Sequence, residues 1–254
     1  MVASSVSTLQ AGASPVPERV LIYEVREVES GRLLFELQGW HEAVTGDDEL
    51  IAAVARTVFP QGSVVQSRAI LTRDDPPRCV SWSGVTRDPT GAVVASTSQK
   101  FTADALPFLL DPLPPDTYPP EAPLGYVISR LHMGRRREKA SFHMLFTGST
   151  LVRMDLWTEE KERVEVPAGT FDSYRIRMRP DPESLFPGLP GFVRAFASFF
   201  IPTQTMWFTD TEPQMLLRFR GHMGPPGSPE MEIRLVRVSE GKAPSSARPS
   251  AASS

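Results

Sequence analysis

The residues of this chain that could do chemistry are few, and the best-placed of them are a histidine and an aspartate on neighbouring alternating segments. His143 lies in the segment Ser141–Phe146, and Asp155 lies in the next one, Leu151–Trp157. Across a β-hairpin the carboxylate could orient the imidazole as a general base. Tyr174 adds a hydroxyl on a third segment. The candidate catalytic residues are therefore His143, Asp155 and Tyr174, although an exposed polar pair across two strands is the simpler explanation of the first two.

Metal and cofactor chemistry find little support in the sequence. The chain has four histidines and one cysteine, Cys79, and contains no HExxH, G-x-S-x-G, P-loop or G-x-G-x-x-G motif. His41 and Glu42 are adjacent, and adjacent strand residues point to opposite faces, so the carboxylate is badly placed to orient the imidazole. We predict no metal site and no cofactor.

Charge and hydropathy exclude two classes of partner. The 254 residues include 27 Lys and Arg against 30 Asp and Glu, a net charge of −3, whereas a nucleic-acid binder would carry a basic surface. No segment approaches the ~18 apolar residues of a membrane-spanning helix. Residues 1–18 contain no Lys or Arg and no unbroken apolar run. They do not resemble a signal peptide, so on this ground a cytoplasmic location is expected.

The dominant period of the sequence is two. Apolar side chains alternate with polar ones along most of residues 19–238, in short segments separated by turn sequences such as Asp88-Pro89-Thr90-Gly91. We predict an all-β single domain over 19–238, built as one curved antiparallel sheet or a lipocalin-like barrel or half-barrel with one short apolar helix. Residues 1–18 and the Ser/Ala/Pro-rich residues 239–254 are predicted to be disordered tails.

Three segments depart from this period. Asp47–Phe59 fits either a helix or another strand, because its apolar run leaves the period undecided. The proline-rich Ala103–Pro123 predicts an ordered crossing loop or strap. Gly191–Ile201 lies between Pro190 and Pro202 and has phenylalanines at helical spacing, which predicts the short apolar helix Phe192–Phe200.

A family resemblance rests on the second half of the chain. Val164, Pro167, Ala168, Gly169, Phe171 and Tyr174, followed by Trp207, Thr209, Asp210 and Arg218, match the pattern of the bacterial DUF3108 family of uncharacterised β-rich proteins. The chain resembles this family over about 150–238, and more vaguely over 19–110. The resemblance implies an exported β-protein, shaped like a carrier of apolar molecules and located in the periplasm or envelope. Independently of it, Pro167-Ala168-Gly169 predicts a turn between two strands.

Aromatic residues supply the candidate binding surface. A barrel of this strand number can keep an interior larger than its own side chains fill. The predicted ligand-binding residues are Trp40, Trp82, Phe142, Phe146, Tyr174, Phe196 and Trp207. Packing of an ordinary core is the alternative for each. The Phe192–Phe200 helix would expose an apolar patch if it lay on solvent. It is expected to plug the sheet, cover a cavity mouth, or meet a membrane surface or a second copy of the chain.

Three functions fit these patterns. The leading one is non-catalytic binding or carriage of a hydrophobic small molecule or lipid-like ligand in a β-barrel cavity. The first alternative is an isomerase or cyclase that orients an apolar substrate in a barrel and uses one acid or base. The second is an interaction protein that uses the Phe192–Phe200 helix.

Overall fold

In the computed structural model of the chain, the residues described are 19–101, 113–120, 123–131, 133, 138–146, 150–192, 201–222 and 227–240. They form thirteen strands and two short helices. The strands are β1 (Arg19–Glu27), β2 (Leu33–Val44), β3 (Asp47–Val58), β4 (Val64–Thr72), β5 (Cys79–Arg87), β6 (Val93–Lys100), β7 (Thr117–Tyr118), β8 (Lys139–Leu145), β9 (Leu151–Val166), β10 (Gly169–Pro180), β11 (Gln204–Thr209), β12 (Leu216–His222) and β13 (Glu230–Glu240). The helices are α1 (Leu124–Ser129) and α2 (Pro182–Leu185). Neither of these described helices is long or apolar enough to cross a membrane.

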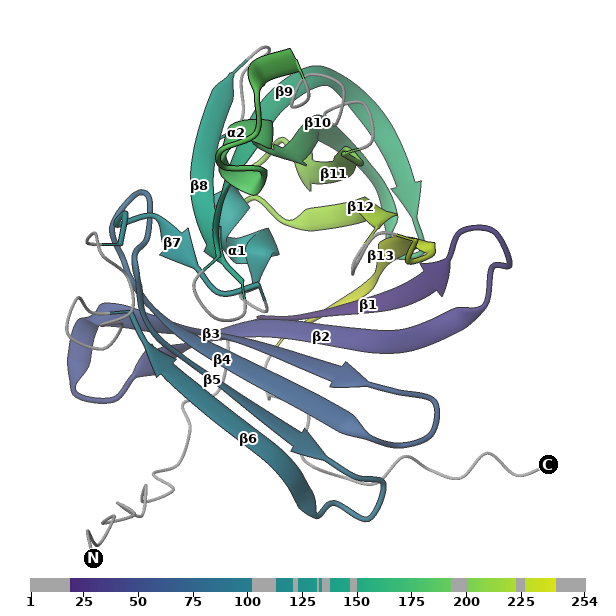
Figure 1. The fold of residues 1–254 in the computed structure, drawn as a ribbon. Coiled ribbons are helices and arrows are strands. Elements are labelled where there is room, and N and C mark those ends of the chain that lie inside the picture. The colour runs from purple at the N-terminus through teal and green to yellow at the C-terminus, as the bar shows by residue number, and fades with distance from the viewer. Residues whose placement is uncertain are drawn as a thin grey trace, which may run out of the picture.

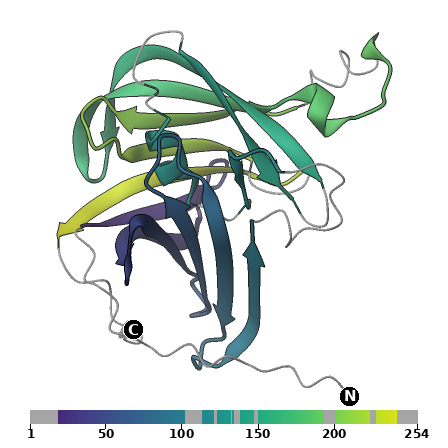
Figure 2. The ribbon, with the colours of Figure 1, turned by 90° about the vertical axis from the view of Figure 1, so that its left-hand side faces the viewer.

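All of these strands belong to one sheet. Their order is β6-β5-β4-β3-β2-β1-β13-β12-β11-β10-β9-β8-β7, and every neighbouring pair is antiparallel except β7 and β8. The sheet therefore consists of two meanders, β1–β6 and β8–β13, joined where β1 pairs with β13. Figures 1 and 2 show the second meander arching above the first. The predicted curved antiparallel sheet is confirmed, and it stays open because β6 and β7 are edges.

The predicted turn at Pro167-Ala168-Gly169 is present and helps to curl the second meander. It joins β9 to β10, and Gly169 has φ 133°, a conformation that side chains other than glycine rarely adopt. β9 is sixteen residues long, and its far end reaches across to the middle of the sheet. There the Ala168 N–H donates a hydrogen bond of 3.1 Å to the carbonyl oxygen of Leu235 on β13.

The inside of the second meander is filled by apolar side chains, most of them its own, with others from α1 and from the first meander, such as Val25 and Leu71. Large apolar residues from β8 to β13 are almost wholly buried there, namely Phe142, Leu156, Ile176, Met178, Phe208, Leu217 and Leu235. Val127 and Ile128 of α1 are fully buried in the same cluster. This part of the sheet is thus a packed core.

The ambiguous segment Asp47–Phe59 forms β3. It follows a tight turn at Gly46, which has φ 82°, and pairs with β2 on one side and β4 on the other. Ala52, Ala53 and Val54 are consecutive and all buried. Burial on both faces removes the alternation by which a strand is recognised, which explains why the period was undecided.

Other sequence expectations meet the structure only in part. Helix α1 was not predicted and begins directly after the proline-rich strap, of which residues 103–112 and 121–122 are outside the described residues. Most of the predicted apolar helix, residues 193–200, also lies outside them, as do residues 1–18 and 241–254. β13 continues to Glu240, beyond the predicted end of the body at residue 238.

Leu235 on β13 tests the contribution of this core. Leu235→Ala is expected to lower the free energy of unfolding by about 2–5 kcal/mol, because the side chain is fully buried and leaves a cavity. The matched control is Val236→Ala on the adjacent, exposed position, expected to cost less than about 1 kcal/mol. Urea unfolding curves of both variants measure the difference. Equal losses would show that the centre of the sheet is not packed as described.

Candidate functional site

A hollow lies between the first meander and α1. It has a volume of about 570 Å³. Its walls come from all six strands β1–β6, from α1, and from parts of β11–β13 with the segment before β12. In Figure 1, α1 lies between the two meanders, above the face of β1–β6. The cavity is thus the unfilled counterpart of the packed core in the second meander.

Small side chains explain why this face leaves space. Across β2 to β6 the register aligns Gly39, Ala55, Ser67, Gly84 and Thr97 in one row. All five residues line the cavity. Residues opposite each other on neighbouring strands share a face, so the row forms a line of small side chains across the sheet. Large side chains at the same positions would fill the hollow.

One edge of the Trp82 indole lies close to Gly84 in this row. A Cβ built on Gly84 would stand 3.1 Å from Cζ2 of the Trp82 indole, which is closer than ordinary contact. A methyl group on Gly84 would therefore require the indole to shift by a few tenths of an ångström. A Cβ on Gly39 would have no neighbour closer than the Val54 carbonyl oxygen at 4.0 Å. The cavity is thus open beside Gly39 and closed over Gly84.

His41 closes one end of the cavity together with α1. Its ring centroid lies 4.3 Å from that of Tyr126. Burial lowers the pKa of His41 from 6.5 to about 4, because the charged imidazolium would lose its hydration. His41 is therefore neutral at pH 7, and Glu42, its neighbour in the chain, points away and pairs with Arg68 at 3.1 Å. The predicted separation of His41 and Glu42 onto opposite faces is confirmed.

The structure does not bring the predicted catalytic residues together. The β8–β9 register places Asp155 opposite Ser141, and Arg153 opposite His143. Asp155 pairs with Arg153 at 3.0 Å, while Nδ1 of His143 lies 3.0 Å from Oδ1 of Asp116. The predicted His143–Asp155 pair is therefore wrong, because the two residues are offset by two positions along the strands.

Asp116 lies in the proline-rich strap, where no period pointed to it. Its carbonyl oxygen also accepts a hydrogen bond of 2.9 Å from the His143 N–H. The His143–Asp116 pair therefore attaches the strap to β8. Tyr174 is elsewhere, half-buried, with Lys161 Nζ 6.0 Å from its ring centroid. None of His143, Asp155 and Tyr174 lines the cavity.

The predicted ligand-binding residues divide between several environments. Trp82 and Trp40 border the cavity, although the register places the Trp40 side chain on the opposite face, in a cluster with Val20 and Val54. Phe142 belongs to the packed core and Phe146 is 38% exposed. Phe196 lies outside the described residues.

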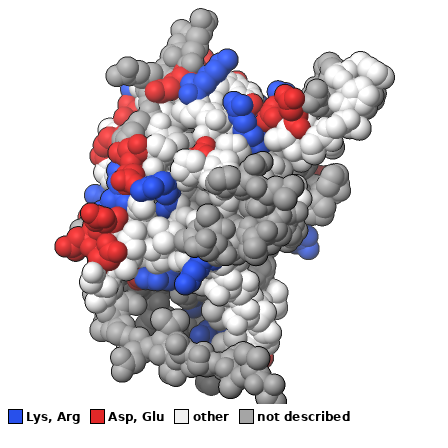
Figure 3. Space-filling model, turned by 60° about the vertical axis from the view of Figure 1, so that its left-hand side comes forward, with Lys and Arg blue, Asp and Glu red and all other residues white. Residues whose placement is uncertain are grey.

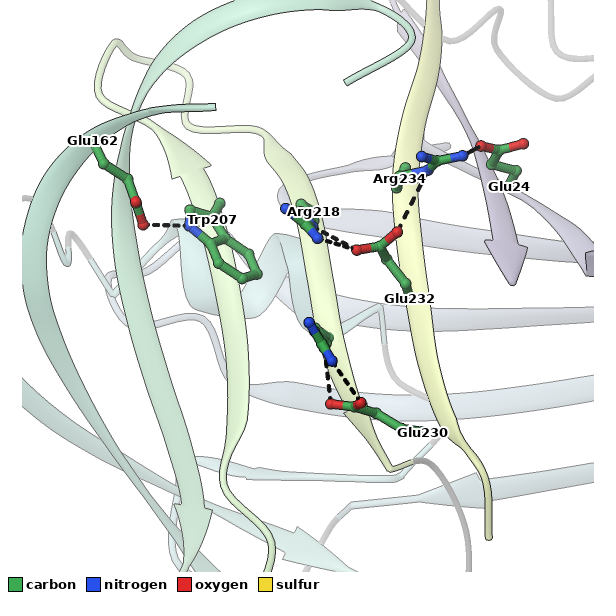
Figure 4. Close-up of polar contacts among 8 residues, drawn as sticks. Glu24, Glu162, Trp207, Arg218, Glu230, Glu232 and Arg234 are labelled. Carbon is green, nitrogen blue, oxygen red and sulfur yellow. Dashed lines mark hydrogen bonds and ion pairs between the residues drawn. The ribbon is translucent and has the colours of Figure 1, made fainter. Parts of the chain in front are cut away.

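Trp207 faces away from the cavity, between the core positions Met206 and Phe208. Its indole N–H donates to Oε1 of Glu162 at 2.6 Å, and the Arg218 guanidinium lies 5.0 Å from its ring centroid (Figure 4). This outer face carries a row of ion pairs that continues from Arg218 to Glu232, then to Arg234 and Glu24. Trp207 is part of that row.

Among the described residues, neither the face drawn in Figure 3 nor the cavity wall carries a concentration of charge that would mark a binding site. On that face, acidic and basic side chains are interspersed and neither sign forms a broad field. The described residues that line the cavity include no Lys, Arg, Asp or Glu. Among the described residues, no group of three or more His, Cys, Asp or Glu side chains could hold a metal ion. Cys79 is buried, which raises the pKa of its thiol to about 12 and leaves it a poor nucleophile.

Sequence reasoning missed the residues that matter most for the hollow. It searched for aromatic side chains, whereas the cavity depends on the row Gly39, Ala55, Ser67, Gly84 and Thr97. A signal was present, since all of these residues except Ala55 on β3 sit at inward positions of alternating segments. The signal becomes visible only once the strands are aligned.

The fold and the cavity define a β-barrel-like protein built on one curved, open antiparallel sheet. Three solved structures show a distant likeness. One is a β-barrel-like protein of the domain of unknown function DUF1849 from Brucella abortus, with 11% identity, TM-score 0.47, and coverage of 89% of this chain and 98% of that one. Another is a predicted lipoprotein from Parabacteroides distasonis, with 10% identity, TM-score 0.36, and coverage of 88% and 95%. The third is a predicted exported protein with a YmcC-like fold from Bacteroides fragilis, with 10% identity, TM-score 0.36, and coverage of 88% and 96%.

No family model matches the sequence, and no curated protein matches it. The resemblance to the DUF3108 family therefore stays a prediction.

Gly84 provides a test of the cavity wall. Gly84→Ala is expected to lower the free energy of unfolding by about 1–3 kcal/mol, because the new methyl group forces the Trp82 indole to move. Gly39→Ala is the control, because its methyl group meets only open space, and no loss is expected. Chemical denaturation of the two variants gives the comparison. An unchanged Gly84→Ala would mean that Trp82 does not lie close to the glycine.

His41 makes stability depend on pH in a defined window. Because its pKa is lower in the folded than in the unfolded chain, the unfolded chain takes up a proton between pH 6.5 and about 4 that the folded chain refuses. The free energy of unfolding therefore falls as the pH drops through this window, by about 3 kcal/mol from this group. His41→Phe is expected to remove that part of the slope.

The measurement is the free energy of unfolding of both proteins at a series of pH values. His222→Gln is the control, because His222 lies outside the cavity and its Nδ1 is 2.8 Å from the Ser228 carbonyl oxygen. The same slope in wild type and His41→Phe would refute the assignment.

Proposed function

We propose that the protein binds a hydrophobic small molecule or lipid-like chain, without altering it, in the cavity between β1–β6 and α1. The observation that carries this proposal is the hollow of about 570 Å³ walled by apolar and small side chains. Its size is within the range of about 300–1,000 Å³ found for small-molecule sites. Burial of apolar ligand surface would supply the affinity, at roughly 25 cal/mol per Å².

The geometry favours binding over the shape-driven isomerase or cyclase. That reaction needs an acid or base beside the substrate, and His143 and Asp155 are outside the cavity with partners of their own. The imidazole that does line the cavity, His41, lies beside Tyr126 and has no carboxylate partner among the described residues. These lining residues are therefore better suited to binding an apolar ligand than to acid–base catalysis.

A membrane surface or a second copy of the chain is a further part of the proposal. Phe192, at the start of the predicted apolar helix, is 79% exposed, and Leu189 just before it is 39% exposed. Both would lose contact with water at such a surface. The location stays a prediction: the periplasm or envelope is implied by the family resemblance.

Gly39→Leu is designed to fill the cavity without straining the backbone. The new side chain would extend into open space, since no atom lies within 4 Å of a Cβ there except the Val54 carbonyl oxygen at 4.0 Å. Nile red, an uncharged dye that fluoresces in apolar surroundings, is expected to bind the wild type and to bind Gly39→Leu more than about tenfold more weakly. Native mass spectrometry of the gently purified protein is expected to show a co-purified ligand that the variant lacks.

Gln66→Leu is the matched control, because it adds the same side chain at an exposed position on the opposite face of the same sheet. It is expected to bind the dye like the wild type. If Gly39→Leu remains folded and binds as well as Gln66→Leu does, the cavity is not the binding site.

A further inference from the structure

The walls of the cavity are uncharged for a reason built into the strands. Where β1–β4 line the cavity, their charged residues occupy the alternate positions that point away from it, such as Glu24, Glu36, Arg56 and Arg68. Glu24 pairs with Arg26 at 2.9 Å on the outer face. Among the described residues, the inward positions that line the cavity carry neither sign of charge.

The polar groups that remain in the wall are neutral. They are hydroxyl groups such as those of Ser67, Thr57 and Thr86, the amide of Gln214, and the imidazole of His41. Burial keeps the His41 imidazole in its neutral form at pH 7. These groups can exchange hydrogen bonds with a hydroxyl, ester or ketone oxygen, but none of them can neutralise an anion.

We infer that the ligand of this cavity is an uncharged lipophile, a mostly apolar molecule whose polar atoms are neutral oxygens, and that fatty acids and phospholipids are rejected. This inference rests on the proposed function and specifies its ligand class. A carboxylate or phosphate that entered the cavity would lose its hydration and find no cation among the described wall residues. Burial of an unpaired charge is far more costly than burial of a hydroxyl that finds a hydrogen bond.

The test compares two ligands of the same chain length, one with a neutral hydroxyl head group and one with an anionic carboxylate. Dodecan-1-ol and dodecanoic acid have the same chain length, and at about pH 8 the acid is almost fully ionised. Displacement of Nile red by each compound is measured on the full chain. We expect the alcohol to displace the dye at a concentration more than about tenfold lower than the acid does.

A variant with a cation in the wall should reverse the selectivity. Thr86 lines the cavity and is only half-buried, so Thr86→Lys can keep its ammonium group hydrated. Thr86→Lys is expected to strengthen binding of dodecanoic acid relative to dodecan-1-ol by at least about fivefold, because the acid gains a partner. Thr86→Gln is the control of comparable polarity without charge and should keep the preference for the alcohol.

The outcomes separate this inference from the proposed function. Displacement by the acid as effectively as by the alcohol in the wild type would overturn the inference while leaving a binding cavity in place. The inference would also be overturned, and the binding cavity left in place, if Thr86→Lys and Thr86→Gln had the same preference between the alcohol and the acid. Failure of Nile red to bind at all, with no difference between Gly39→Leu and Gln66→Leu, would overturn the proposed function and this inference with it.

Discussion

The pairing of β1 with β13 is the interaction on which the rest of this structure depends. It is the one place in the described sheet where the two meanders share backbone hydrogen bonds, with a register that runs from Arg19 opposite Glu240 to Glu27 opposite Met231. Because of this pairing, the two meanders form one continuous sheet, and their inner faces border a common interior. α1 can then pack against the second meander and border the cavity of the first.

The two meanders solve the same packing problem in opposite ways. The second fills its concave face with large apolar side chains such as Phe142, Phe208 and Leu217. The first carries Gly39, Ala55 and Ser67 at equivalent inward positions and so leaves a hollow. A folded chain normally gains stability by filling such space, since a void forfeits contacts. A hollow kept beside a well-packed core is therefore a feature that a ligand would explain.

Structural features set by neighbouring residues could be predicted from the sequence, whereas features set by residues far apart in the chain could not. Alternation at period two is local, so the strands, the curved antiparallel sheet and the turn at Gly169 could be predicted. The identity of β3 could not, because Ala52, Ala53 and Val54 are all buried and carry no period. The row of small residues could not be predicted either, because it depends on the register of five strands. That register is set by the lengths of the turns and by bulges, such as those between Ile70 and Leu71 and between Thr86 and Arg87.

The partner of His143 was out of reach for a related reason: Asp116 comes from a segment without a period, twenty-seven residues earlier in the chain.

The central position of β1 and β13 has a consequence for how the molecule comes into being. Arg234 and Glu24, which pair across this join, are separated by 210 residues. Each meander can form early from hairpins between neighbours, whereas the join requires the closure of nearly the whole chain. During synthesis the apolar concave face of the first meander therefore stays exposed until the last strand has emerged, and that interval is when a chaperone would be of most use.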